Sequence, residues 1–209
     1  FNLTGTKIAP ALAGGNACVV KPPSAGAMTC LYFGAIMREA GLPPGVLSIV
    51  TGKGEEIGDY IVAHPGISMI AFTGSSSTAR RIASKASMIP LLFELGGKDA
   101  ALVLPDADLE LTASQIVSGA FSYSGQRCTA VKRVLVFEEN ARSLLDRITE
   151  LVSRLSVGPP RDNPVISALI SPAQCDYVQG LVDDALAKGA TLLCGNRREG
   201  NVMRPTVLD

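Results

Sequence analysis

The chain has 209 residues, of which 47% are hydrophobic, so it can bury the core of one large or two small domains. Nineteen lysines and arginines balance 19 aspartates and glutamates, which argues against a surface for nucleic acid or an anionic membrane. No apolar run is long enough to cross a bilayer, and the five cysteines show no Cys-x-x-Cys spacing. We therefore expect a cytoplasmic protein that binds neither nucleic acid nor membrane.

The first half of the chain alternates short apolar runs with helical patterns. The expected strands are residues 17–21, 47–50, 68–72 and 90–94, and the expected helices are residues 24–39, 55–63 and 75–86. Ser24 and Ser75 stand where helix caps are expected. Such alternation indicates parallel strands joined by helical crossovers, so this half is predicted to be doubly wound α/β.

The alternation continues after the glycine pair Gly96-Gly97, with different element lengths. Strands are expected at residues 100–104, 133–137 and 191–194, and helices at residues 109–123, 140–155 and 171–188, with a Gly-Pro-rich loop at residues 157–164. Asp106 or Asp108 is expected to begin the first of these helices. We place a domain boundary at the glycine pair, which separates residues 1–97 from residues 98–209.

A turn at Gly74 and Ser75 closes one expected strand and opens the next helix. Free backbone N–H groups and the helix dipole favour a phosphate at such a place, although an ordinary capped helix has the same pattern. A second glycine-rich segment, residues 52–58, is not the dinucleotide fingerprint, because its G-x-G-x-x-x-G spacing is one residue too long.

Cys128 is the candidate nucleophile. It follows the polar turn Gly125-Gln-Arg127, which makes a poor core, and Arg127 favours a thiolate electrostatically. The other four cysteines lie in apolar or helical contexts and are interpreted as core residues. His64 is the only histidine, and no metal-ligand cluster is apparent, so neither Cys-His catalysis nor a metal site is expected.

Glu94 is the candidate general base. It ends an apolar run before Gly96-Gly97, and partly apolar surroundings are expected to raise the pKa of its carboxyl group. A salt-bridged structural acid is the alternative for Glu94 taken alone. A thiol nucleophile together with a carboxylate base favours acyl transfer through a thioester.

Two segments carry a resemblance to a known family. Residues 93–98, Phe-Glu-Leu-Gly-Gly-Lys, and residues 121–132, around Gly-Gln-Arg-Cys-Thr, resemble the glutamate and cysteine motifs of the aldehyde dehydrogenase superfamily. Residues 8–12, 20–22, 41–45 and 72–75 agree with it as well. Within the superfamily, residues 21–24, 58–61 and 125–134 look most like the non-phosphorylating, NADP-dependent glyceraldehyde-3-phosphate dehydrogenases.

The resemblance implies an α/β fold with a truncated, Rossmann-like cofactor domain in residues 1–97 and part of a catalytic domain in residues 98–209. It implies that Cys128 is the nucleophile and Glu94 the base. The residues implied to bind the cofactor are Lys21, Ser24, Asp59, Gly74, Ser75 and Leu95, and those implied to bind substrate are Arg127 and Thr129. Lys21 and Ser24 without a nearby acid favour NADP, with NAD as the alternative.

The implied reaction oxidises a small aldehyde, glyceraldehyde 3-phosphate, to 3-phosphoglycerate through a cysteine thioester, without inorganic phosphate. One alternative is another aldehyde dehydrogenase, acting on lactaldehyde or a semialdehyde, and another is an inactive binding or scaffold homologue. Family members are more than twice as long, so the resemblance implies an internal fragment, inactive alone, of a homo-oligomeric enzyme. The oxyanion-hole asparagine would then precede Phe1.

Overall fold

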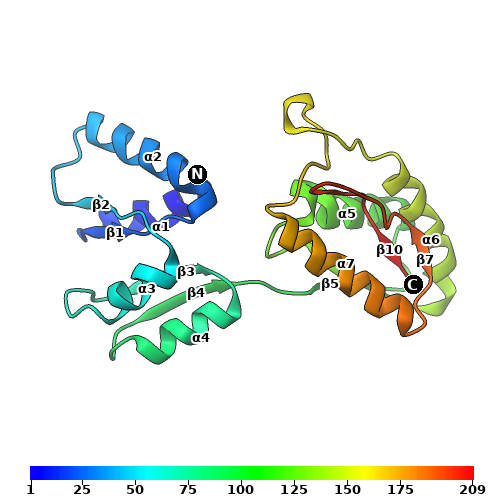
Figure 1. The fold of residues 1–209 in the computed structure, drawn as a ribbon. Coiled ribbons are helices and arrows are strands. Elements are labelled where there is room, and N and C mark those ends of the chain that lie inside the picture. The colour runs from blue at the N-terminus through cyan, green and yellow to red at the C-terminus, as the bar shows by residue number, and fades with distance from the viewer. The chain divides into compact units, whose positions relative to one another are not determined.

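The computed structural model describes residues 1–209, which form two compact units, residues 1–95 and residues 96–209 (Figure 1). The chain passes from one unit to the other between Leu95 and Gly96, beside the glycine pair. Helices and parallel strand pairs occur in both units, which confirms the α/β class. None of the helices combines the length and apolar character that crossing a membrane requires.

The first unit contains two pairs of parallel strands with intervening helices. Its elements are α1 (Asn2–Ala13), β1 (Cys18–Val20), a 3-10 helix (Ser24–Gly26), α2 (Ala27–Glu39), β2 (Leu47–Ile49), α3 (Gly54–Ala63), β3 (Ile70–Gly74), α4 (Ser76–Lys85) and β4 (Leu91–Leu95). β1 pairs with β2, and β3 pairs with β4, both in parallel. The β3–β4 register places Thr73 opposite Glu94, and the Thr73 hydroxyl donates to the Glu94 carboxylate.

Two helix starts in this unit differ from expectation. Ser24 does not cap α2, because a 3-10 turn intervenes and α2 begins at Ala27 after Gly26. Helix α1 was not expected, since Gly5 and Pro10 lower its intrinsic helix propensity and no side chain caps its start. Ser75, by contrast, caps α4 by accepting a hydrogen bond from the Thr78 N–H.

The second unit contains one parallel strand pair and two short antiparallel pairs. Its elements are β5 (Asp99–Val103), α5 (Leu109–Phe121), a 3-10 helix (Ser122–Gly125), β6 (Val131–Val136), α6 (Glu138–Ser153), a 3-10 helix (Pro160–Asp162), α7 (Pro172–Ala187), β7 (Leu192–Cys194), β8 (Arg198–Glu199), β9 (Val202–Met203) and β10 (Val207–Leu208). β5 pairs in parallel with β6, whereas β7–β10 and β8–β9 are antiparallel. Asp108, one of the two expected residues, caps α5.

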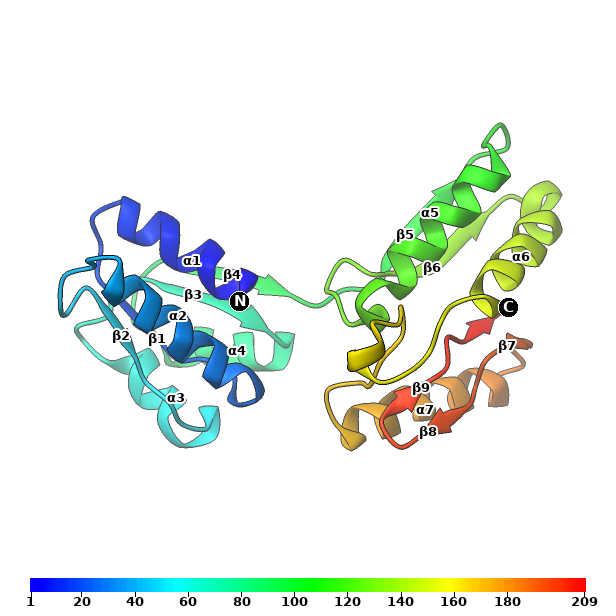
Figure 2. The same ribbon diagram turned by 90° about the horizontal axis from the view of Figure 1, so that it is seen from above.

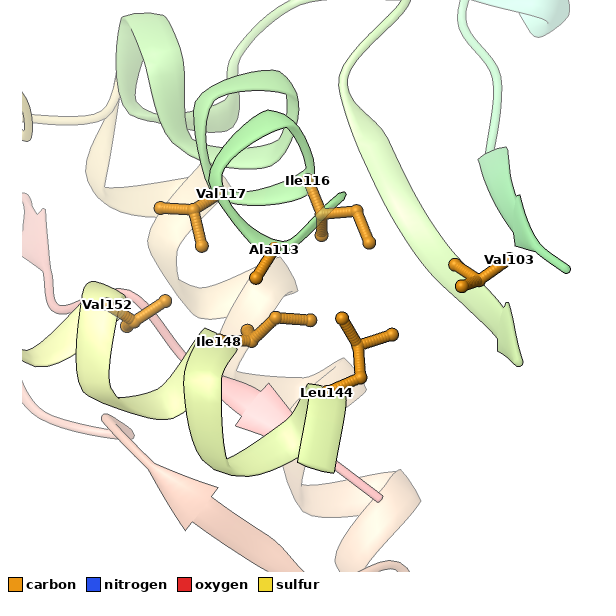
Figure 3. Close-up of a cluster of buried hydrophobic side chains, with 7 residues drawn as sticks. All are labelled: Val103, Ala113, Ile116, Val117, Leu144, Ile148 and Val152. Atoms are coloured by element: carbon orange, nitrogen blue, oxygen red, sulfur yellow. The ribbon is translucent and has the colours of Figure 1, made fainter. Parts of the chain in front are cut away.

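The core of the second unit lies between α5, α6 and β5 (Figure 3). Seven apolar side chains meet there, each at most 6% exposed: Val103, Ala113, Ile116, Val117, Leu144, Ile148 and Val152. The spacing of three or four residues along α5 and α6 puts their apolar side chains on one face of each helix. Burial of one large aliphatic side chain stabilises the fold by roughly 1.5–3 kcal/mol, so this cluster fixes α5 and the loop that follows it.

Candidate active site

The loop between α5 and β6 presents Cys128 to solvent. Helix α5 ends at Phe121 because Tyr123 and Ser124 adopt φ values of 54° and 56°, which no α-helix accommodates. The chain then turns at residues 127–130, closed by a 3.2 Å hydrogen bond from the Ala130 N–H to the Arg127 carbonyl. The expected helix over residues 109–123 is therefore two residues too long.

The exposure of Cys128 separates it from the other four cysteines. Cys30 and Cys175 are buried, whereas Cys18 and Cys194 are partly buried, and burial raises the pKa of both of those thiols. A raised pKa leaves less thiolate at neutral pH, and a buried sulfur is closed to substrate. Accessibility thus favours Cys128 as the reactive thiol of this chain.

Lys132 clamps the turn that carries Cys128. Its Nζ donates to the carbonyl of Arg127 at 3.2 Å and to that of Ala130 at 3.1 Å, on either side of the cysteine. Burial lowers the pKa of Lys132, with a smaller contribution from Lys98, while Asp99 and Cys128 oppose the shift. Sequence reasoning missed this residue, although a lysine inside an apolar strand pattern was a visible signal.

Arg127 directly precedes Cys128 in the chain, and its guanidinium has no carboxylate partner. Its Cζ stands 5.5 Å from the centroid of the Tyr123 ring, in cation–π range. No carboxylate in the structure comes within ion-pair distance of it, and both Arg127 and Thr129 are exposed. An exposed, unpaired guanidinium can bind an anion such as a phosphate.

Glu94 lies near the carboxyl end of β4, in the first unit, and 54% of its side chain is exposed. Its Oε2 accepts hydrogen bonds from Lys7 Nζ at 2.5 Å and from Thr73 Oγ1 at 3.0 Å. The ammonium of Lys7, and then the Thr73 hydroxyl, lower the pKa of Glu94. The expectation of a raised pKa was wrong, because the carboxylate points out of the strand toward a cation rather than into apolar surroundings.

The hydrogen bonds of Glu94 leave one carboxylate oxygen free. Both donors bind Oε2, and Oε1 has no hydrogen-bond partner in the protein. An ionised carboxylate with one free oxygen can still accept a proton from water. Sequence reasoning missed Lys7 and Thr73, since neither α1 nor the β3–β4 register could be derived from a pattern.

Lys21 and Ser24 stand just after β1. Lys21 is partly buried, and its Nζ donates to the Pro22 carbonyl at 2.9 Å without a carboxylate partner. Ser24 is exposed at the start of the 3-10 helix, and no acidic residue occurs from residue 17 to residue 38. A cation and a hydroxyl without a competing acid fit a phosphate better than a diol.

The turn from β3 into α4 is built around Gly74 and Ser75. A Cβ on Gly74 would lie 2.4 Å from the Phe72 ring, so any larger residue there would force that ring to move. The Ser75 side chain satisfies the Thr78 N–H, while the N–H groups of Ser76 and Ser77 have no partner in the protein. Free amides at a helix start can bind phosphate oxygens, so the capped helix and the phosphate site are compatible here.

Asp59 and Leu95 are the two remaining candidates for cofactor binding. Asp59 on α3 accepts two hydrogen bonds from Arg81 on α4, at 2.9 and 3.0 Å, and this guanidinium lowers the pKa of Asp59. The pair ties two helices together and occupies both carboxylate oxygens. Leu95 is partly buried at the end of β4.

The sequence matches the aldehyde dehydrogenase family model over residues 1–209. The chain belongs to the aldehyde dehydrogenase family. An Arabidopsis thaliana NADP-dependent glyceraldehyde-3-phosphate dehydrogenase is 51% identical to this aldehyde dehydrogenase chain over 208 residues, which cover 100% of the chain and 42% of the relative. The family resemblance drawn from the two motifs is confirmed.

Solved structures agree with the sequence comparison. The NADP complex of the NADP-dependent glyceraldehyde-3-phosphate dehydrogenase from Bacillus halodurans C-125 matches with a TM-score of 0.97 and 55% identity, over 99% of this chain and 44% of that one. Lactaldehyde dehydrogenase from Escherichia coli matches with a TM-score of 0.95 and 34% identity, over 99% and 45%. The chain thus spans less than half the length of these relatives, and its fold is shared by aldehyde dehydrogenases with different substrates.

Proposed function

We propose that this chain is part of a non-phosphorylating, NADP-dependent glyceraldehyde-3-phosphate dehydrogenase. The observation that carries the proposal is the exposed Cys128 with the unpaired guanidinium of Arg127 beside it. A thiol supplies the nucleophile for an aldehyde, and an adjacent free arginine suits a phosphorylated one. The names and identities of the relatives support the same substrate. We place the full-length enzyme in the cytoplasm, as a homo-oligomer.

Cys128 begins the proposed reaction. Its thiolate attacks the aldehyde carbon, a C–S bond forms, and the carbonyl π electrons move onto the oxygen. The Cys128 N–H makes no hydrogen bond within the protein, so it can donate to that oxygen. Lys132 holds the turn in place, Thr129 adjoins the substrate, and Arg127 binds the substrate phosphate.

NADP, when bound, supplies the acceptor for the hydride that leaves the substrate carbon. Lys21 and Ser24 would hold its 2′-phosphate, and Gly74 with Ser75 would admit its pyrophosphate to the start of α4. Asp59 and Leu95 are assigned to the cofactor by family resemblance. NAD is the alternative cofactor, and the absence of an acid beside Ser24 favours NADP over it.

Glu94 completes the cycle by activating water. Its free Oε1 accepts a proton as the water oxygen attacks the thioester carbonyl, and the C–S bond then breaks to release the acid and the Cys128 thiolate. Lys7 and Thr73 keep Oε2 engaged and the carboxylate ionised at neutral pH. Water is the acyl acceptor, so inorganic phosphate takes no part.

The two roles can be separated in the full-length enzyme. Cys128→Ser should abolish oxidation, because a hydroxyl without an adjacent base is a weak nucleophile at neutral pH. Glu94→Gln should give a burst of NADPH followed by a slow steady state, since deacylation alone needs the base. Glu56→Gln, an exposed change on α3, is the control. A steady-state rate in Glu94→Gln equal to that of the control would contradict the role of Glu94.

The substrate is tested by comparing a phosphorylated and an unphosphorylated aldehyde. Arg127→Gln should raise the KM for glyceraldehyde 3-phosphate at least tenfold and leave that for glyceraldehyde nearly unchanged, because only the former carries a charge for the guanidinium. An equal change for both aldehydes would favour the alternative, an aldehyde dehydrogenase for lactaldehyde or a semialdehyde.

A further inference from the structure

The β8–β9 hairpin of the second unit carries two arginines directly opposite one another. The strands pair Arg198 with Met203 and Glu199 with Val202, and the Arg204 N–H donates to the Arg197 carbonyl at 2.8 Å. The pairing therefore extends by one residue beyond each strand. Because side chains alternate between the faces of a strand, Arg197, Glu199, Val202 and Arg204 share one face.

The two arginines of this face have no counterion. Neither guanidinium forms an ion pair or a hydrogen bond in the structure, and like charges directly opposite on a hairpin are destabilising. Arg198, on the other face, is paired: its Nη1 donates to Asp176 of α7 at 2.5 Å and its Nε donates to the Gly200 carbonyl at 2.8 Å. Figure 2 shows the hairpin beside α7, where this pair joins them.

A cavity lies against this face. Its volume is about 360 Å³, and it is partly open to solvent. The hairpin lines it with Arg197, Glu199, Val202 and Arg204, and residues 157–160 with Ala168 complete the lining. No residue of the Cys128 turn lines this cavity, so it is a separate feature of the unit.

We infer that this cavity binds a small phosphate monoester whose organic part carries hydroxyl groups. Arg197 and Arg204 are both exposed and line the same hollow, so two unpaired guanidiniums are available to one phosphate, and a bound dianion reduces the repulsion between them. Glu199 has no hydrogen-bond partner and faces the same space, so it can accept a hydroxyl hydrogen. The wall of Val157 and two prolines suits the carbon skeleton of such a molecule.

The test measures binding rather than turnover, so it does not depend on the proposed function. Isothermal titration calorimetry is performed with glycerol 2-phosphate on the full-length protein carrying Arg127→Gln, which removes the arginine assigned to substrate phosphate. We expect one saturable site per chain. Adding Arg197→Gln or Arg204→Gln should raise the Kd at least tenfold, as expected for loss of one charge-assisted contact.

Two further arms sharpen the assignment. Arg142→Gln removes the same charge from an exposed position on α6 and should leave the Kd unchanged. Glu199→Gln should weaken glycerol 2-phosphate but not inorganic phosphate, which separates the monoester from the free anion. Melting temperatures check folding, and Arg204→Gln should not lower that of the ligand-free protein, because it relieves repulsion.

Three outcomes would overturn the inference. They are the absence of saturable binding, an equal Kd in the Arg197→Gln and Arg142→Gln proteins, and binding of inorganic phosphate without glycerol 2-phosphate.

Discussion

Replacement of Lys132 by methionine tests whether the cysteine turn is held by its ammonium. Methionine keeps the length and apolar stem of the side chain but removes both hydrogen bonds, at 3.2 Å to Arg127 and 3.1 Å to Ala130. We expect the turn at residues 127–130 to lose its fixed geometry while the core of α5 and α6 stays intact. The thiol should then spend less time in the position that reacts.

The magnitude follows from opposing terms. A hydrogen bond from a charged donor contributes roughly 1.5–3 kcal/mol, so two could reach about 3–6 kcal/mol if fully buried. Lys132 is exposed, so water competes for both hydrogen bonds, and its desolvation further opposes the gain, as the lowered pKa of its ammonium reflects. We therefore expect a loss of about 1.5 kcal/mol, which corresponds to roughly a tenfold fall in the population of the reactive geometry.

Alkylation of the full-length protein by iodoacetamide, with Cys128 labelling followed by mass spectrometry, measures this directly. We expect labelling of Cys128 and the NADPH burst to slow together by about tenfold. Lys98→Met is the matched control, because it removes a neighbouring exposed cation that makes no hydrogen bond to the turn. Labelling as slow in Lys98→Met as in Lys132→Met would refute the clamp and leave a general charge effect as the explanation.

Two other substitutions test the first unit. Lys7→Met should raise the pKa of Glu94, because Lys7 is the chief cause of its lowering. The acidic limb of the pH profile for deacylation should then move to higher pH. A limb that does not move in single-turnover kinetics would argue against a role for the Lys7–Glu94 pair. The stabilisation from the Lys7–Glu94 pair is present above the usual carboxyl pKa and is lost as pH falls through the lowered value. Lys7→Met should therefore lower stability slightly at neutral pH and leave it unchanged at pH values below the lowered pKa of Glu94. Ser24→Glu should weaken NADP by about 1–2 kcal/mol relative to NAD, since Ser24 is exposed and partly screened. Equal weakening of both cofactors in fluorescence titrations, or the same effect from Ser24→Gln, would show that Lys21 and Ser24 do not read the 2′-phosphate.

The sequence alone determined the family and most of the elements. Apolar runs and helical periodicity located β1 to β6 and α2 to α7 within a few residues, because alternating strands and amphipathic helices leave local patterns. Caps at Ser75 and Asp108 marked helix starts for the same reason, as their hydrogen bonds are local. Cys128 stood out through its polar neighbours, and its exposure in the structure agrees with that.

Other features depended on contacts between residues distant in sequence. The pKa of Glu94 is lowered by Lys7, 87 residues away, and by Thr73, placed opposite it only by the register of β3 and β4. The local sequence around Glu94 is an apolar strand, and it predicts a raised pKa for Glu94 where the structure gives a lowered one. The error arises because a strand residue can face either side of the sheet. The residues that the side chain meets there decide whether its charged form is favoured.

The arginine pair of the β8–β9 hairpin shows the same division. Arg197, Arg198 and Arg204 look alike in the sequence, as charges in a Gly-rich segment, and strands of two residues are too short to leave a periodic signal. Pairing places Arg198 on one face with Asp176, and Arg197 and Arg204 together on the other against a cavity. The sequence specifies the chemistry of each side chain. The long-range contacts of the folded chain decide which charged side chains have a partner.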